Sequence, residues 1–376
     1  MVTILMKVLM ICEFSAGICG VWSRVFLEAK ALVSKGHEVH VLSTNIEKGT
    51  GDIVRDYEVL DGVKIHRFHS STSSFSKNVN NFNFSKELSE LNPGVVITHL
   101  IHPHSFKALK SCQKLSVPCF LVTHAPFGVK RSFPLNLATW LYYNFVVKNK
   151  ISGFTKIITI TNWEVPYLNN LGISGDKLVF IPNSVPEDFF KQKIKPFSNK
   201  NVRIMFLGRV APVKNIPLLV DAFKRINNPD LTLEIVGPIE KGYESIKNFS
   251  TKKIVFSKPI FNLSVKIMKL QEAGIFILPS IREGLPQSLL EALALGKIVV
   301  ASDTLGSKEV IIDSKNGYLF RNGSVDSLVE VLRKVLSLKN SSIKKIQSNA
   351  RVSVKGYSTS SVINKLNKLL NSLNKK

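Results

Sequence analysis

Cysteine is scarce in this chain of 376 residues, and long apolar runs are missing. The four cysteines, at positions 12, 19, 112 and 119, are too few and too scattered for a disulfide scaffold. None of them has C-x-x-C spacing, which disfavours a zinc site. No stretch approaches the ~18 apolar residues of a membrane span. The first ten residues contain Lys7 and lack the length and cleavage site of a secretory signal peptide. These absences predict a protein of the reducing cytoplasm.

Acidic residues are missing between Glu90 and Glu164, where eight lysines and arginines stand. The formal net charge is +24, and residues 191–376, with 32 basic and 13 acidic side chains, supply most of it. Such a field attracts nucleic acid, an anionic membrane or phosphorylated substrates. A solvated, lysine-rich surface with no partner is an equally good interpretation.

Short β-branched runs alternate with longer helical stretches along the whole chain, which predicts parallel sheets in an α/β protein. The pattern restarts at Asn201, after the polar stretch 191–201. We therefore expect two doubly wound domains, at residues 1–185 and 186–356. A terminal helix over 357–376 should pack back toward the first domain. In such sheets ligands bind at the carboxyl ends of the strands, here between the domains.

Two carboxylates stand in the stretch REGLPQSLLEALALGKIVVAS, residues 282–302. Glu291 lies in a helix that is apolar nearly all round, so its carboxylate should be buried and needs a partner. That partner is either a lysine or arginine, or the hydroxyls of a bound ligand. Pro286 suits a first helical position, so the free N–H groups of the helix should point toward Glu283 and the loop 284–285, forming an anion site.

Two further constellations follow predicted strands. FLGRVAPVKN places Arg209 and Lys214 after a strand, where two cations suit a diphosphate, although an ordinary basic loop has the same appearance. FSAGICGVWSR places Gly17 and Gly20 between the first strand and a helix, where the backbone could approach a phosphate or an acceptor. The second stretch is not a dinucleotide fingerprint, because it lacks GxGxxG and no acid ends the next strand.

Histidines cluster near two other predicted strand ends, as His99, His102 and His104 in THLIHPHS and His124 in VTHAP. Their spacing has no accompanying carboxylate and does not match a tetrahedral metal site. Histidines at strand ends more often donate hydrogen bonds to a polar ligand or to the backbone. We therefore expect no metal.

Together these segments resemble the retaining glycosyltransferases of the GT-B fold, family 4. The most specific motif is E-x7-E, here Glu283 and Glu291, and GRVAPVKN resembles the family's GR…K phosphate motif. KLVFIPNSV resembles its hinge, and residues 17–39 resemble its N-terminal glycine loop and helix. The resemblance implies two Rossmann-like domains that face each other across a cleft.

The resemblance also implies roles for individual residues. Glu291 would bind the ribose hydroxyls of a nucleotide, and Glu283 would lie by the donor sugar. Gly284, Leu285 and Pro286 would present the helix amino end to the sugar and diphosphate, and Arg209 and Lys214 would neutralise the leaving diphosphate. His124 would contact the sugar at its 6-hydroxyl, and Gly20 the phosphates or the acceptor. No metal or other cofactor is implied, since cations and a helix dipole stabilise the leaving group.

The leading hypothesis is therefore transfer of a hexose from a nucleotide sugar, such as GDP-mannose or UDP-glucose, to a glycan, glycolipid or lipid-linked acceptor. An epimerase of the same fold is an alternative. A nucleic-acid-binding protein is a weaker one, because aromatic residues are not interleaved with the basic ones. The positive, apolar segment 131–156 suggests peripheral contact with the cytoplasmic face of the membrane. It could equally be a buried helix with Trp140 and Tyr142 in the core.

Overall fold

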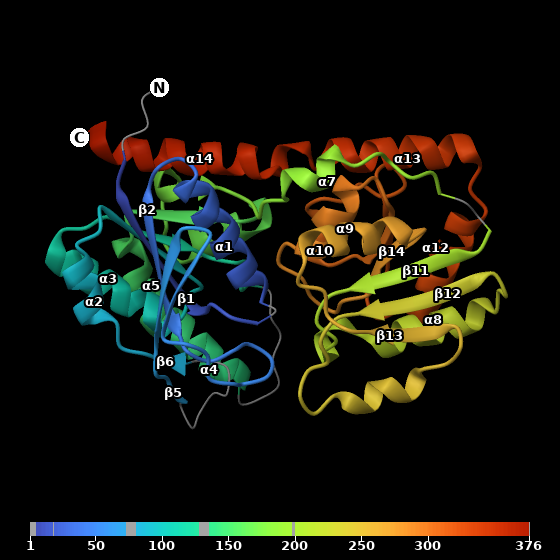
Figure 1. Ribbon diagram of the computed structural model, residues 1–376, viewed down its shortest axis with the longest axis horizontal. Coiled ribbons are helices and arrows are strands. Elements are labelled where there is room, and N and C mark those ends of the chain that lie inside the picture. Colours follow the sequence, from blue (N-terminus) through green and yellow to red (C-terminus); the bar gives the residue numbers. More distant parts are fainter. Residues whose placement is uncertain (1–4, 18, 73–79, 128–134, 198–199, 376) are drawn as a thin grey trace. The chain divides into compact units, whose positions relative to one another are not determined.

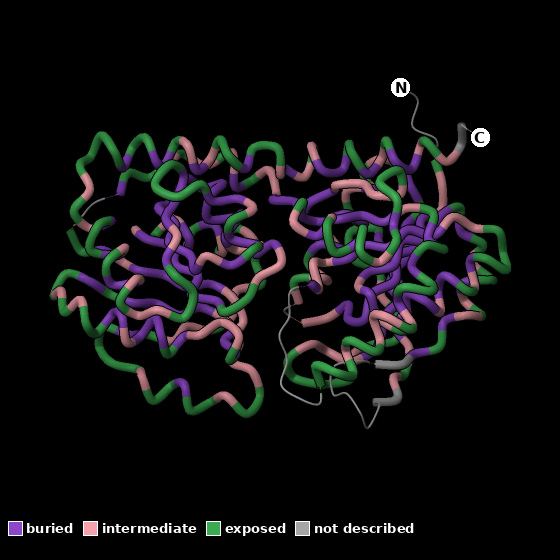
Figure 2. The backbone as a smooth tube through the Cα atoms, turned by 180° about the vertical axis from the view of Figure 1, so that it is seen from behind, coloured by how far each residue is buried: buried purple, intermediate pink, exposed green. Residues whose placement is uncertain are grey.

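The computed structural model describes residues 5–17, 19–72, 80–127, 135–197 and 200–375. Its internal contacts divide the chain into two compact units. Unit 1 comprises Met1–Ser184 together with Thr359–Lys376, and unit 2 comprises Val185–Ser358. Figure 2 shows that buried residues are concentrated along the strands of each unit, as expected for sheets covered on both faces.

Unit 1 is built on an eight-stranded sheet of order β10-β9-β8-β7-β1-β2-β4-β3, in which only β3 runs antiparallel to its neighbour. The order reverses beside β1, because the chain continues from β1 to β2 on one side and from β7 to β8 on the other. This reversal is the switch point at which α/β sheets bind ligands. The strands are β1 Lys7–Phe14, β2 Glu38–Thr44, β3 Tyr57–Leu60, β4 Val63–Phe68, β7 Val95–His99, β8 Cys119–Val122, β9 Lys156–Thr159 and β10 Leu178–Phe180.

Helices connect these strands and cover the sheet (Figure 1). Helix α1 ends shortly before Gly36, whose φ of 91° lets the chain turn back into β2. The terminal helix α14 belongs to unit 1 and packs on α1, and Asn367 lies within 3.2 Å of the ring of His37. The helices are α1 Gly20–Val33, α2 Ser85–Leu91, α3 Pro103–Leu115, α4 Leu135–Leu141, the π-helix η1 Tyr142–Val147, α5 Lys148–Lys150, α6 Val165–Asn170 and α14 Thr359–Asn371, with a short hairpin of β5 Ser71–Thr72 and β6 Asn80–Asn81.

Unit 2 is built on a six-stranded, wholly parallel sheet of order β13-β12-β11-β14-β15-β16. Here the order reverses between β11 and β14. Helix α8 connects β11 to β12 and helix α10 connects β14 to β15, in opposite directions along the sheet. Because such crossovers are right-handed, the two helices lie on opposite faces of the sheet. The strands are β11 Val202–Leu207, β12 Leu231–Val236, β13 Ile254–Ser257, β14 Ile275–Leu278, β15 Ile298–Ser302 and β16 Tyr318–Phe320. The helices are α7 Glu187–Lys191, α8 Ile216–Ile226, α9 Leu263–Glu272, α10 Gln287–Ala294, α11 Leu305–Lys308, α12 Val325–Leu336 and α13 Asn340–Ser353.

Candidate functional site

The loops after β11 and β14 meet at the switch point of unit 2. The first carries Arg209 and Lys214, and the second carries Glu283. The amide of Ile281 donates a hydrogen bond of 2.9 Å to the carbonyl of Val213, which ties the two loops together. Residues 69 positions apart in the chain are thereby brought to one edge of the sheet.

Glu283 and Lys214 form an ion pair at this edge. The Nζ of Lys214 donates to Oε1 of Glu283 at 2.6 Å, and the hydroxyl of Ser280 donates to the same oxygen at 2.6 Å. The Glu283 side chain is almost wholly buried and that of Lys214 mostly so. A carboxylate held by two donors has one defined orientation, and a neighbouring lysine supplies a positive charge that is not fully hydrated.

Helix α10 begins just after this carboxylate. Its first residue is Gln287 and Pro286 is the N-cap, with extended backbone, so the prediction that Pro286 is the first helical residue is wrong by one position. The loop before it is packed tightly: a Cβ on Gly306 of α11 would lie 2.1 Å from the carbonyl oxygen of Gly284. Gly284, Leu285 and Pro286 are therefore held at the amino end of an eight-residue helix, where the helix dipole favours negative charge.

Glu291 is buried within α10, as its apolar surroundings predict, and it has a lysine partner. Lys266 of α9 donates to Oε1 at 3.0 Å and to Oε2 at 3.3 Å, and Gln287 lies 3.4 Å from Oε1. Of the two partners left open by the sequence, the structure contains the lysine. The Lys266 side chain is a quarter exposed, at 26%, so this edge of the carboxylate site is open to solvent.

Arg209 is also paired, with Glu240 from the loop after β12. The two loops touch through their backbones: the amide of Val210 donates to the carbonyl of Pro238 at 2.8 Å, and the amide of Glu240 donates to the carbonyl of Val210 at 2.9 Å. Glycine is required where they cross, because a Cβ on Gly237 would lie 1.9 Å from the oxygen of Gly208. The guanidinium of Arg209 is half-exposed at this crossing.

In unit 1 the loop after β1 makes its close approach at Gly17. With φ of 79°, a Cβ there would lie 2.3 Å from the carbonyl oxygen of Lys48. Gly20 is the first residue of α1 and is exposed, and a Cβ added to it would meet no atom of the described residues within 4 Å. A side chain at position 17 would therefore clash with the backbone of Lys48, which explains the glycine there. At position 20 the described residues leave space beside the backbone.

The histidines that end or follow β7 and β8 lie close together in unit 1. The Nδ1 of His99 lies 2.9 Å from Nε2 of His124, and His104 Nε2 lies 2.8 Å from the carbonyl of His99. Burial holds the pKa of both His99 and His124 well below the usual range and lowers that of His104 to about 4, so the rings are neutral. In the described residues no group of three or more His, Cys, Asp or Glu side chains is arranged to hold a metal ion.

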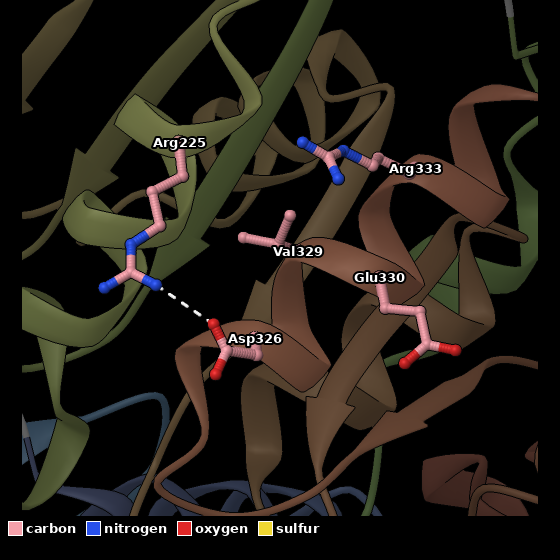
Figure 3. Close-up of a pocket in the computed structure, with 5 residues that line it drawn as sticks. All are labelled: Arg225, Asp326, Val329, Glu330 and Arg333. Carbon is pink, nitrogen blue, oxygen red and sulfur yellow. Dashed lines mark hydrogen bonds and ion pairs between the residues drawn. The ribbon is translucent and has the colours of Figure 1, made fainter.

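A separate hollow of about 370 Å³ lies between α8 and α12 in unit 2 (Figure 3). One cation and one acid of its lining are already paired, since Arg225 donates to Asp326 at 3.0 Å; Arg225 also donates to the nearby Asp221 at 2.9 Å. None of the predicted site residues lines it. The hollow is therefore not a second candidate site.

Two family models match the chain in succession. "Glycosyltransferase Family 4" matches residues 18–189, and "Glycosyl transferases group 1" matches residues 187–353. The chain belongs to this glycosyltransferase family. The two matches meet where unit 1 passes into unit 2, so each model describes one α/β unit.

Solved structures of glycosyltransferases share the fold over nearly the whole chain. Sucrose-phosphate synthase from Thermosynechococcus elongatus superposes with a TM-score of 0.79 at 15% identity, covering 98% of this chain and 99% of that one. HepE from Anabaena, in complex with UDP and glucose, superposes with a TM-score of 0.74 at 16% identity, covering 98% and 100%. The GT-B fold is thus confirmed.

Curated relatives match over a smaller share of the chain. An Escherichia coli UDP-Gal:α-D-GlcNAc-diphosphoundecaprenol α-1,3-galactosyltransferase is 26% identical over 63% of this chain, which covers 66% of that relative. A GDP-mannose-dependent α-mannosyltransferase of Mycolicibacterium smegmatis is 24% identical over 84% of both chains. The chain thus spans just under two thirds of the first of these glycosyltransferases.

The sequence did not indicate three residues that form hydrogen bonds or ion pairs with the predicted site residues. Ser280 stands three positions before Glu283, and such a hydroxyl could have been noticed in PSIRE. Lys266 and Glu240 come from other loops and helices, and no local pattern marks them. Their pairing depends on strand order, which the sequence does not state.

Proposed function

We propose that this chain moves a hexose from a nucleotide-diphospho-sugar to a glycan, glycolipid or lipid-linked acceptor, with retention of anomeric configuration. The observation that carries the proposal is the Lys214–Glu283 pair at the switch point of unit 2, beside the amino end of α10. Positive charge and a helix dipole at one sheet edge suit the diphosphate that leaves during such a transfer.

The residues of unit 2 divide into two roles under this proposal. Lys214, Arg209 and the α10 amino end stabilise the departing diphosphate, and Glu291 binds the ribose hydroxyls. Glu283, fixed by Ser280 and Lys214, lies beside the sugar and stabilises positive character at the anomeric carbon. No step requires a metal ion, because the leaving charge is met by these groups.

Retention without a covalent intermediate is consistent with the surroundings of Glu283. Oε1 of Glu283 already accepts two hydrogen bonds, which draw electron density from the carboxylate and lower its nucleophilicity. We propose attack on the same face that the leaving group vacates, with a phosphate oxygen taking the proton of the acceptor hydroxyl. In unit 1, His124 is proposed to contact the donor sugar, and Gly20 the phosphates or the acceptor.

A donor screen tests the proposal. Binding of UDP-glucose, UDP-galactose, UDP-N-acetylglucosamine and GDP-mannose is measured by calorimetry, and slow hydrolysis by release of free nucleotide. At least one donor should bind and be hydrolysed in the absence of acceptor. If none of the four binds, the proposal is wrong; an epimerised sugar in place of transferred sugar would indicate the alternative enzyme class.

The acceptor is proposed to be lipid-linked and the enzyme to bind the membrane surface peripherally. The support is the apolar face of α4 and η1, defined by Leu135, Leu137, Trp140, Leu141 and Phe145, whose side chains are 42% to 63% exposed. The interpretation of this segment as a buried helix is wrong for Trp140, whereas Tyr142 does pack on the core. Exposed Lys148 and Lys150 follow this face; the nearby Lys130 and Arg131 lie outside the described residues.

Apolar side chains flanked by lysines suit the interface of an anionic bilayer. None of the described helices has the length and hydropathy needed to cross a membrane. Flotation with phosphatidylglycerol-containing vesicles should carry the protein, and the double change Trp140→Ser, Phe145→Ser should abolish it. Changing two exposed apolar residues of unit 2, Ile312→Ser and Val352→Ser, is the matched control. Equal flotation of both variants would exclude this face as the contact.

A further inference from the structure

The backbone at the end of β8 has an unusual conformation. His124 and Ala125 are consecutive residues with φ of 59° and 53°, in the left-handed region that side chains disfavour. Neither is a glycine or an asparagine, and two such residues in succession persist only where surrounding contacts hold them. The segment from Thr123 to Ala125 must therefore be restrained by something outside itself.

The restraint comes from Glu164, a fully buried carboxylate at the start of the next helical segment. Its Oε1 accepts hydrogen bonds from the amides of Ile160 at 2.9 Å and Thr161 at 3.1 Å, and from the Thr161 hydroxyl at 3.1 Å. These bonds complete a capping box, in which a glutamate at the third helical position bonds back to the N-cap residue. They account for one oxygen of the carboxylate.

The second oxygen makes contacts that the cap does not need. Oε2 accepts from the Thr123 hydroxyl and from the amide of Ala125, the latter at 2.9 Å. These two donors stand on either side of His124. Burial raises the pKa of Glu164, while the bonds to both oxygens act in the opposite direction and favour the charged form. One carboxylate therefore joins the end of β9 to the strained turn that carries His124.

The imidazole of His124 is restrained as well. Its Nε2 lies 2.9 Å from Nδ1 of the buried His99, so one ring donates and the other accepts. This contact uses Nε2, so Nδ1 is the ring nitrogen of His124 that a ligand could engage. Within the described part of the chain, Nε2 of His99 has no hydrogen-bond partner. The His99 ring therefore contacts His124 through its other nitrogen, Nδ1.

We propose that Glu164 is a positioning residue: through Oε2 it holds Thr123 and Ala125 so that the turn stays left-handed and His124 presents Nδ1 outward. The inference rests on the proposed function in one respect, that the ligand of His124 is the donor sugar. The geometry of the turn itself does not depend on that function.

The matched variants are Thr123→Val and Thr161→Val. Each removes one buried hydroxyl that donates to Glu164, but Thr123 bonds to Oε2, the oxygen that also accepts from Ala125, and Thr161 bonds to Oε1, the oxygen of the cap. A purely structural glutamate predicts similar effects of both on melting temperature and activity. The positioning role predicts that Thr123→Val lowers kcat by about tenfold or more, because small misplacements of a reacting group have large effects on rate. Thr161→Val should stay within about twofold, and Thr123→Ser, which restores the hydroxyl, should recover the rate.

Nuclear magnetic resonance of the histidine rings gives a readout that does not need activity. The ¹⁵N shifts of His124 should change in Thr123→Val and in Glu164→Gln and stay unchanged in Thr161→Val. A double-mutant cycle tests whether Thr123 acts through His124. The double variant Thr123→Val, His124→Ala should be as active as His124→Ala alone, since the turn then has no ring to position.

The two possible failures are distinguishable. Unchanged His124 shifts in both Thr123→Val and Glu164→Gln, or equal loss of rate in the Thr123 and Thr161 variants, would overturn the positioning role whatever the enzyme's substrate. Changed ring shifts in a protein that binds no nucleotide sugar would instead overturn the proposed function and leave the turn geometry confirmed. If Thr123→Val does not fold, Glu164→Gln gives the same ring-shift test.

Discussion

The contact between Glu291 and Lys266 gives the sharpest test of the nucleotide site. The same buried carboxylate is either one half of a structural ion pair or the group that binds ribose. The two possibilities predict different results for Glu291→Gln and Lys266→Met, because each change removes a different half of the pair. Both residues lie in unit 2, so the comparison depends only on that unit.

Glu291→Gln keeps an acceptor for the lysine but loses the negative charge. A hydrogen bond to a charged group contributes about 1.5–3 kcal/mol, so losing about 2 kcal/mol of ribose binding should raise the Kd for the preferred nucleotide about 30-fold. The effect on stability should be small, because glutamine still accepts from Lys266. Calorimetric titration with UDP and GDP measures the first quantity, and thermal unfolding the second.

Lys266→Met should act in the opposite direction on the two quantities. It leaves a buried carboxylate without its lysine, and because Lys266 is partly exposed we expect a loss of about 2 kcal/mol, or about 4–8 °C in Tm. Ribose hydroxyls would then satisfy the unpaired carboxylate, so nucleotide affinity should be retained or increased. The thermal protection given by saturating nucleotide should be larger in this variant than in the wild type.

The matched control is Glu272→Gln, which alters an exposed glutamate of the same unit that lies 3.3 Å from Lys269. It should leave nucleotide affinity unchanged. The reasoning is refuted if Glu291→Gln binds every nucleotide as tightly as the wild type. In that case Lys266 alone explains the acid in the apolar helix.

Three other outcomes are expected. Gly306→Ala should lower turnover about a hundredfold, because the added Cβ displaces the loop of Glu283. Gly356→Ala, where no atom lies near the Cβ position, should leave turnover unchanged, and equal turnover rates of the two variants would contradict this. Lys214→Ala should reduce kcat more than it weakens donor binding, as steady-state kinetics would show, and a change in KM alone would disprove it. The pKa of His104 is about 4 in the folded protein and about 6.5 in the unfolded chain. As pH falls, the imidazole is therefore protonated in the unfolded chain before it is protonated in the folded protein. Stability should therefore drop by about 3 kcal/mol between pH 6.5 and 4 relative to His104→Gln, measured by urea unfolding at several pH values; parallel profiles would contradict the assignment.

Much of the fold could be predicted from sequence because buried parallel strands are continuous apolar runs. The apolar run KVLMICE at 7–13 predicts a strand and corresponds to β1, and the stretch 216–226 predicts a helix and corresponds to α8. The pattern missed β3 and β16. Strand β3 is an exposed, antiparallel edge strand without a continuous apolar run, and the apolar run of β16 is only three residues long, too short to predict a strand.

The site could be predicted only in part, because sequence motifs identify residues and strand order decides which of them meet. The E-x7-E spacing indicated both acids, and Arg209 and Lys214 were recognisable after a strand. That Lys214 reaches Glu283 follows from β11 lying beside β14, which no local pattern states. Glu164 could not be recognised for the same reason, since its second oxygen bonds to a segment about 40 residues earlier in the chain.

The charges at the switch point of unit 2 have a consequence for how a diphosphate binds. The chain carries a net charge of +24, yet the cations Arg209, Lys214 and Lys266 are each paired with a glutamate. A bound diphosphate must therefore share or replace a carboxylate partner, and the total charge of the protein says little about the affinity. The Arg209–Glu240 pair is the most exposed of the three, so its exchange costs the least desolvation.

Removing that acid should consequently strengthen binding. Glu240→Gln frees Arg209 for phosphate oxygens, and we expect UDP or GDP to bind a few-fold more tightly, with the gain reduced at high salt because both groups are half-exposed. Calorimetric titration at two salt concentrations measures the gain. The control is Glu244→Gln, a change of an exposed glutamate whose carboxylate accepts from the amide of Gly242. Weaker binding in Glu240→Gln would mean that Glu240 orients Arg209 for the phosphate. The acid would then be a working part of the phosphate site, and its competition with the ligand would be disproved.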